Sequence, residues 1–102
     1  PLVFMVLPWA VGHTADLEAI GATIHRVDYL DVPFRRKNGK RMAFDKACRY
    51  SKIHAWSLTQ FQRAVYLDPT LLITANIDEL FQFPEFSAVK VVGDEFNTAL
   101  FV

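Results

Sequence analysis

An uninterrupted apolar run near the start of the chain constrains the fold most. Residues 2–7, with the sequence LVFMVL, contain no polar position. A strand with one face in water alternates apolar and polar residues, so a continuous run predicts a strand covered on both faces, as in a parallel sheet. The run is too short to cross a bilayer as a helix, and no basic segment precedes it. We therefore expect a central strand of an α/β fold here.

A second strand is expected soon after the first. Thr14 or Asp16 can cap a short helix that ends near Ile20, where Gly21 supplies a stop. Residues 23–29 follow and are rich in β-branched and aromatic residues, which favours a strand. Together these segments predict one strand-helix-strand unit.

The rest of the chain continues this alternation. Residues 43–61 lack Gly and Pro and carry apolar residues at three- and four-residue spacing, which predicts the longest helix. Further expected elements are strands at 63–67, 87–92 and 96–102, a brief pairing segment at 71–73, and a short helix capped by Asn76 and ending near Phe81. The pattern indicates a three-layer α/β/α sheet in one domain, with Trp56 and the nine Phe residues mainly in its core.

Composition narrows the function classes. The chain is 52% hydrophobic and 22% charged, which is globular, and its net charge of zero removes any global electrostatic case for nucleic acid or an anionic membrane. The basic segment 35–41 could bind anions locally, but a solvated loop is the simpler interpretation. Cys48 is the only cysteine and fits a reducing compartment, although both the cytoplasm and the Golgi lumen stay open.

One carboxylate stands out as a candidate site residue. Asp68 directly follows the strand expected at 63–67 and precedes Pro69 and Thr70. A carboxylate at the end of a buried strand is fixed in position and suits a divalent cation or a ribose hydroxyl. The alternative is a plain turn, because Asp followed by Pro commonly opens one.

Several separated stretches carry a resemblance to a known family. They occur in the order YSKIHAWSLTQF at 50–61, VYLDPTLLI at 65–73, NIDELF at 76–81, EFSA at 85–88 and FNTALFV at 96–102. This text resembles the glycogenin-type sugar transferases of glycosyltransferase family 8. The resemblance implies a GT-A type nucleotide-sugar-binding domain that moves a glucose-like hexose from a UDP-sugar with retention, assisted by Mn²⁺.

The resemblance also assigns a metal site. Asp68 matches the first carboxylate of the family's Asp-x-Asp motif, and Thr70 stands where the second carboxylate is found. A unit charge pair is worth roughly 4 kcal/mol at about 4 Å and an effective dielectric near 20, so the change to Thr70 should weaken metal binding by orders of magnitude. Thr70 can still offer a neutral oxygen.

Three more residues match donor contacts of the family. Lys52 matches a lysine aimed at the donor phosphates, although by itself it resembles a solvated mid-helix lysine. Asn97 matches the asparagine of a Phe-Asn-Ser-Gly motif, in which Ser and Gly have become Thr98 and Ala99, and Asp94 resembles the aspartate of the preceding loop. No histidine has a metal-ligand spacing to another, so packing or solvent roles are expected for His13, His25 and His54.

The chain starts with Pro1 and ends inside an apolar run at Val102, so we expect residues 1–102 to be part of a longer catalytic domain. No catalytic residue can be assigned, and the acceptor, glycan or protein, stays open. The expected partner is a UDP-sugar, with neither nucleic acid nor a membrane segment. The alternative hypothesis is a degenerate transferase-like domain that serves as a binding or scaffold module, since Thr70 and Ala99 depart from the family motifs.

Overall fold

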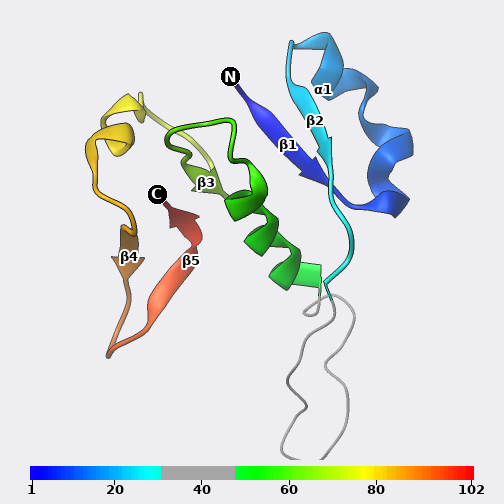
Figure 1. Ribbon diagram of the computed structural model, residues 1–102. Coiled ribbons are helices and arrows are strands. Elements are labelled where there is room, and N and C mark those ends of the chain that lie inside the picture. Colours follow the sequence, from blue (N-terminus) through cyan, green and yellow to red (C-terminus); the bar gives the residue numbers. More distant parts are fainter. Residues whose placement is uncertain (31–47) are drawn as a thin grey trace, which may run out of the picture. The chain divides into compact units, whose positions relative to one another are not determined.

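The computed structural model describes residues 1–30 and 48–102 (Figure 1). The described chain divides into two compact units, Pro1–Leu58 and Thr59–Val102, which are treated separately. The basic segment 35–41, the first part of the helix expected at 43–61 and the side chain of Cys48 lie outside the described residues.

The first unit contains the expected strand-helix-strand arrangement. Strand β1 (Val3–Val6) pairs in parallel with β2 (Thr23–Arg26), in a register that sets Val3 opposite Thr23 and Val6 opposite Arg26. Between them lie a 3₁₀ helix, η1 (Pro8–His13), and a short helix, α1 (Ala15–Ala19), as Figure 1 shows. Gly21 has a φ of +83°, which ends the helical segment at little steric cost. The predicted order of strand, helix and strand is confirmed. The second strand ends at Arg26 instead of residue 29, and Thr14 makes no side-chain capping bond. Among the described residues β1 lies in a two-stranded sheet and is mostly half-buried, so it is not the central strand, covered on both faces, that was expected.

The helix expected at 43–61 is shorter and more tightly wound over its described part. It forms the 3₁₀ helix η2 (Cys48–Ser57). The Ser57 hydroxyl donates to the carbonyl of His54 at 2.7 Å, three residues back, and so satisfies a backbone acceptor in the last turn. At the other end, Ser51 is buried and its Oγ accepts the N–H of Leu30 at 3.3 Å. The bond between Leu30 and Ser51 attaches η2 to the segment that follows β2.

The second unit is built on an antiparallel sheet in the order β3-β5-β4. Strand β3 (Tyr66–Leu67) sets Tyr66 opposite Phe101, and β4 (Ala88–Lys90) forms a hairpin with β5 (Phe96–Phe101). Gly93, at a φ of +80°, lies in the hairpin turn. A 3₁₀ helix, η3 (Asp78–Gln82), precedes the hairpin. The N-cap of η3 is Ile77 and not Asn76 as predicted, although the Oδ1 atom of Asn76, one residue before the cap, accepts the N–H of Asp78 at 2.7 Å.

The prediction that residues 71–73 pair as a short strand is wrong. Leu71, Leu72 and Ile73 form no strand and are 40%, 86% and 55% exposed. The carbonyl of Asp68 instead accepts the N–H of Leu71 at 3.0 Å, which closes a turn around Pro69. This turn takes the chain away from β3, so the apolar residues beyond it find no partner strand among the described residues.

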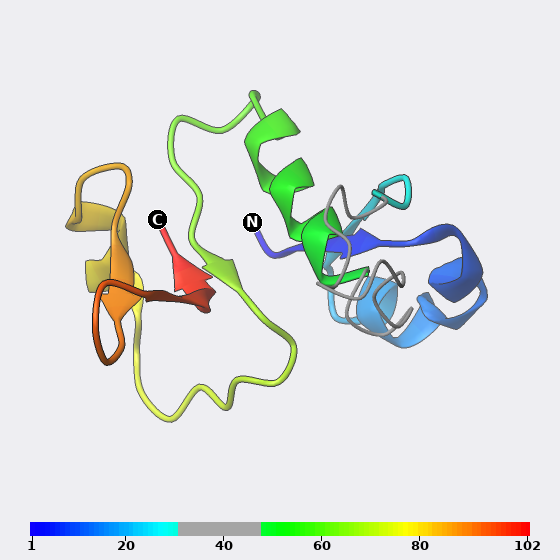
Figure 2. The same ribbon diagram turned by 90° about the horizontal axis from the view of Figure 1, so that it is seen from below.

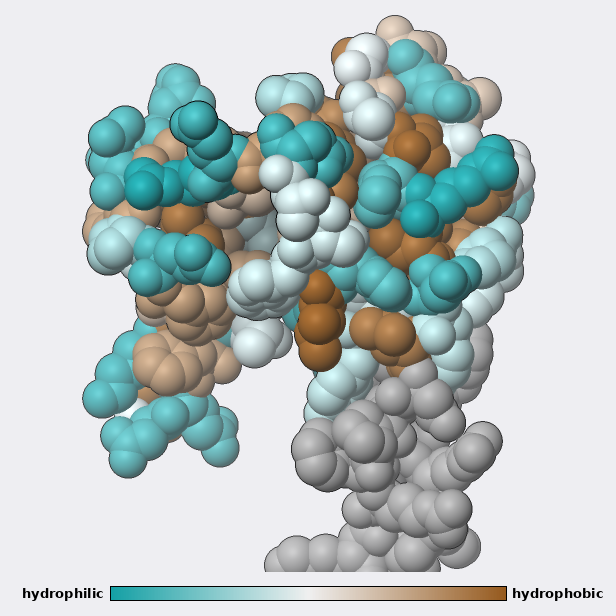
Figure 3. All heavy atoms as spheres, in the orientation of Figure 1, coloured by the Kyte–Doolittle hydropathy of each residue, from teal (hydrophilic) through white to brown (hydrophobic). Residues whose placement is uncertain are grey.

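The expectation that the aromatic residues lie mainly in the core is also wrong. In the first unit the buried apolar residues are Val6, Ala22 and Val27, whereas Trp56 is about half exposed. In the second unit Phe101 and Val102 are buried, while the exposed phenylalanines are Phe81, Phe83, Phe86 and Phe96. The space-filling view accordingly shows apolar side chains at the surface (Figure 3). Each unit is too small to enclose all of its large side chains.

The described residues therefore form a mixed α/β structure with one parallel and one antiparallel sheet. Over residues 1–30 and 48–102, no helix has both the length and the apolar character needed to cross a bilayer.

Candidate functional site

The main chain of Asp68 is held on two sides. Its N–H donates to the carbonyl of Ala99 on β5 at 2.8 Å, which extends the sheet one residue beyond β3. Its own carbonyl accepts the N–H of Leu71 at 3.0 Å in the turn that follows. Figure 2 shows β3 and β5 side by side from a second direction. The backbone that carries the candidate carboxylate is thus fixed both by the sheet and by the turn.

The side chain of Asp68 is fixed by a tyrosine. Tyr66 lies two residues earlier, so both side chains share a face of the strand, and its hydroxyl donates to Oδ1 of Asp68 at 2.8 Å. The pKa of Tyr66 is raised above its usual range by burial first, and then by the hydrogen bond to Asp68 and its negative charge. Tyr66 therefore remains protonated and acts as the donor in this bond.

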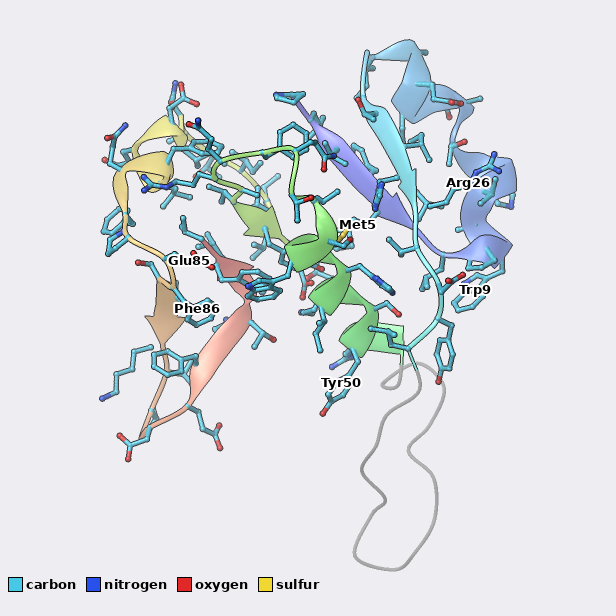
Figure 4. All side chains as sticks on the ribbon, viewed as in Figure 1. Met5, Trp9, Arg26, Tyr50, Glu85 and Phe86 are labelled. Carbon is cyan, nitrogen blue, oxygen red and sulfur yellow. The ribbon has the colours of Figure 1, made fainter. Side chains whose placement is uncertain are left out.

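An aromatic row supports this tyrosine. The rings of Tyr66 and Phe101 are stacked, with centroids 4.7 Å apart and an interplanar angle of 12°. Phe86 packs on Phe101 at 5.8 Å and meets the edge of Phe96 at 6.5 Å, and Figure 4 shows Phe86 beside the hairpin. Tyr66 was not singled out from the sequence. Its place two residues before Asp68 in an expected strand was the signal that could have identified it.

The described residues near Asp68 contain few metal ligands. Thr70 is exposed in the turn two residues later. Within residues 1–30 and 48–102, no group of three or more His, Cys, Asp or Glu side chains is arranged to hold a metal ion. A hard divalent cation can, however, be bound by one or two carboxylates together with substrate phosphates. The donor set of Asp68 and Thr70 fits such an ion when a diphosphate supplies further oxygens.

Asn97 lies on β5 and is connected to Asp68 through Ala99. Its Oδ1 atom accepts the N–H of Ala99 at 2.9 Å, and the carbonyl of the same Ala99 accepts the N–H of Asp68 at 2.8 Å. The side chain of Asn97 is exposed on β5. Asp68 and Asn97 are therefore connected through the main chain of Ala99, and their joint role at a donor site stays a prediction.

Asp94 lies elsewhere in the same unit. It belongs to the turn between β4 and β5, and its Oδ1 atom is 3.9 Å from Nζ of Lys90 with both side chains exposed. Figures 1 and 2 show this turn at the far end of the hairpin from β3. Such an exposed pair contributes little to stability, and the structure does not bring Asp94 beside Asp68.

Lys52 belongs to the first unit, where it lies half-buried in η2. Its role beside a donor phosphate stays a prediction, because the site at the end of β3 belongs to the second unit. His54 follows on the same helix, and its Nε2 atom lies 2.9 Å from the carbonyl oxygen of Asp28. That bond fits the structural role expected for this histidine.

The first unit has a hollow at the carboxyl ends of its two parallel strands. Its volume is about 360 Å³, and it is lined by Pro8, Val11, Arg26, Val27 and Asp28. Figure 4 marks Arg26 and the neighbouring Trp9 of η1 at this side of the unit. The location follows the rule that ligands gather at the carboxyl ends of parallel strands, although no residue here was expected as a site residue.

The chain is similar to two groups of sugar-transferring proteins. It is 43% identical over 60 residues to glycogenin-1 of Caenorhabditis elegans, which covers 57% of this chain and 14% of that protein. It is 36% identical over 90 residues to UDP-glucuronate:xylan alpha-glucuronosyltransferase 1 of Arabidopsis thaliana. This match covers 88% of this chain and 13% of that protein. It is also 35% identical over 81 residues to human glycogenin-2. This match covers 78% of this chain and 15% of that protein.

The chain thus spans between 13% and 15% of the length of these relatives. No family model and no solved structure matches it. Over most of its length the chain is thus similar to glycogenins and glucuronosyltransferases, which is consistent with a fragment of a glycogenin-like protein of glycosyltransferase family 8.

Proposed function

We propose that this protein is a retaining glycosyltransferase that moves a glucose-like hexose from a UDP-sugar to an acceptor glycan or protein. The observation that supports this most is the presentation of Asp68. Its main chain is bonded to Ala99 and Leu71, and its carboxylate is bonded to Tyr66, at the end of a strand within a segment shared with sugar transferases. An ordinary turn aspartate needs none of the support from Tyr66.

In this proposal the end of β3 holds the donor diphosphate with a Mn²⁺ ion. Asp68 supplies a carboxylate oxygen to the metal and contacts the ribose, and Thr70 supplies a neutral oxygen. When bound, the metal ion provides positive charge that stabilises the departing diphosphate. Lys52 adds a cation for the phosphates. Asn97 orients the donor sugar. Asp94 contributes to donor binding only if the hairpin turn moves closer to β3.

The donor sugar can be tested directly, because the relatives differ in their names. One relative is named for transferring glucuronate to xylan, and the others are glycogenins. We propose a neutral glucose-like hexose, and competition between UDP-glucose and UDP-glucuronate for the same protein measures the preference. Tighter binding of UDP-glucuronate would contradict this part of the proposal.

The decisive test replaces Asp68 in the full-length protein. Calorimetric titration with UDP and Mn²⁺ should show that Asp68→Ala weakens metal-dependent UDP binding by about two orders of magnitude or more, because one carboxylate beside a divalent ion is lost. Asp16→Ala removes the same charge from the exposed first turn of α1 and should leave binding unchanged. Unchanged binding in Asp68→Ala would remove this residue from the site.

A second candidate function is a binding or scaffold module without catalysis, which the exposed Thr70 favours. The discriminating variant is Thr70→Asp, which restores a second carboxylate two residues from Asp68. If the site is otherwise intact, Mn²⁺ affinity should rise by about tenfold or more and metal-dependent donor hydrolysis should increase. Absence of both gains, in a variant that folds normally, would favour the scaffold.

A further inference from the structure

The support of Tyr66 by its neighbours gives its hydroxyl a fixed position. The ring lies 4.7 Å from that of Phe101, almost parallel to it, and Phe101 is only 5% exposed. Phe86 covers Phe101 at 5.8 Å. A tyrosine stacked in this way has little rotational freedom, so its hydroxyl meets Oδ1 of Asp68 from one direction.

The consequence for Asp68 is a defined carboxylate orientation. A carboxylate has two oxygens and about four lone-pair sites, and the bond from Tyr66 occupies one site on Oδ1. The N–H of Asp68 donates to Ala99, which fixes the Cα position as well. Because Thr70 replaces a second carboxylate, the metal-binding geometry depends on this one group. Residues that hold a metal ligand in position influence metal affinity strongly.

We propose that Tyr66 is a positioning residue for the donor site: its hydroxyl holds the Asp68 carboxylate in the orientation that receives the divalent cation of the sugar nucleotide. Tyr66 itself touches neither metal nor donor in this scheme. The proposal rests on the proposed function of Asp68. It adds to the donor site a residue, Tyr66, that acts on Asp68 through a hydrogen bond.

The test uses Tyr66→Phe in the full-length protein. This variant keeps the ring that stacks on Phe101 and removes only the hydroxyl. Mn²⁺ binding in the presence of UDP, followed by the loss of the free-ion electron paramagnetic resonance signal, should weaken by about tenfold. UDP binding without metal should stay unchanged, which a general loss of structure would not allow.

Two further variants complete the experiment. Tyr29→Phe removes a hydroxyl from a half-buried tyrosine whose ring lies 6.0 Å from Trp9 in the first unit, and it should bind Mn²⁺ like the parent protein. Asp68→Ala reports on the site itself. If Asp68→Ala abolishes Mn²⁺ binding and Tyr66→Phe leaves it intact, the positioning role is overturned while the site stands. If Asp68→Ala leaves Mn²⁺ binding intact, the site and the role of Tyr66 are both overturned.

Discussion

The two units of this chain differ in how their strands pair and in which side chains pack within each unit. In Pro1–Leu58 a parallel strand pair needs a crossover, which η1 and α1 provide, and the buried apolar side chains among its described residues are small aliphatic ones. In Thr59–Val102 an antiparallel hairpin and a short third strand are joined by a row of aromatic rings. The crossover of the first unit follows local sequence signals, whereas the aromatic row of the second unit joins residues from distant parts of the chain. The candidate site lies in the second.

Among the variants that test the difference between the two units, Phe101→Ala should lower stability most. Phe101 is buried and contacts both Tyr66 and Phe86, so the variant loses the centre of the aromatic row and should destabilise the second unit by roughly 3–5 kcal/mol. Amide hydrogen exchange in the full-length protein measures this change, with faster exchange expected in β3 and β5.

A matched control lies in the first unit. Val6→Ala removes two methyl groups from a residue that is 8% exposed, and at about 0.8 kcal/mol per buried group the loss should be roughly 1–2 kcal/mol. Faster exchange should then appear in β1 and β2. Equal exchange changes in both units for either variant would contradict the division of the chain into two compact units.

A smaller effect is expected from Ser51→Ala, which tests how η2 is attached. The buried Ser51 hydroxyl accepts the N–H of Leu30, so the variant leaves this N–H without its partner and should cost about 1–2 kcal/mol in urea unfolding. Ser57→Ala removes an exposed hydroxyl from the same helix and should cost less. An equal cost for both would show that the bond to Leu30 is unimportant.

The smallest expected change in stability is a loss at alkaline pH, caused by Tyr66 in the second unit. Burial, the hydrogen bond to Asp68 and its negative charge raise the pKa of Tyr66 above the usual value near 10. The folded state therefore keeps this proton at a pH where the unfolded state has lost it, so stability is fully present below about pH 10 and falls as pH rises above it. Urea unfolding of the parent protein and Tyr66→Phe, compared at about pH 9 and pH 11, should show a steeper loss in the parent.

Local signals in the sequence were sufficient for much of the fold. The apolar run at 2–7 predicts β1, and Gly21 and Gly93 mark a helix stop and a hairpin turn where both adopt positive φ. Asn76 lies one residue before Ile77, the N-cap of η3, and accepts the N–H of Asp78. Each of these depends on residues adjacent in the chain, whose conformational preferences act before any tertiary contact forms.

Other features could not be predicted from sequence patterns because they depend on which surfaces meet. Hydrophobicity placed Trp56 and most phenylalanines in the core, but two small units leave many of these rings exposed. Apolar residues at 71–73 suggested a strand, but the turn at Pro69 separates them from the sheet. Burial requires a partner surface, and a linear pattern does not specify that partner.

The sequence by itself determined that a carboxylate follows a short strand, in a chain similar to glycogenins and glucuronosyltransferases. Only the tertiary structure decided how that carboxylate is held. Strand pairing stacks Tyr66 on Phe101, and the stack aims the tyrosine hydroxyl at Asp68. Tyr66 and Phe101 are far apart in the chain, so their contact exists only once the strands have paired.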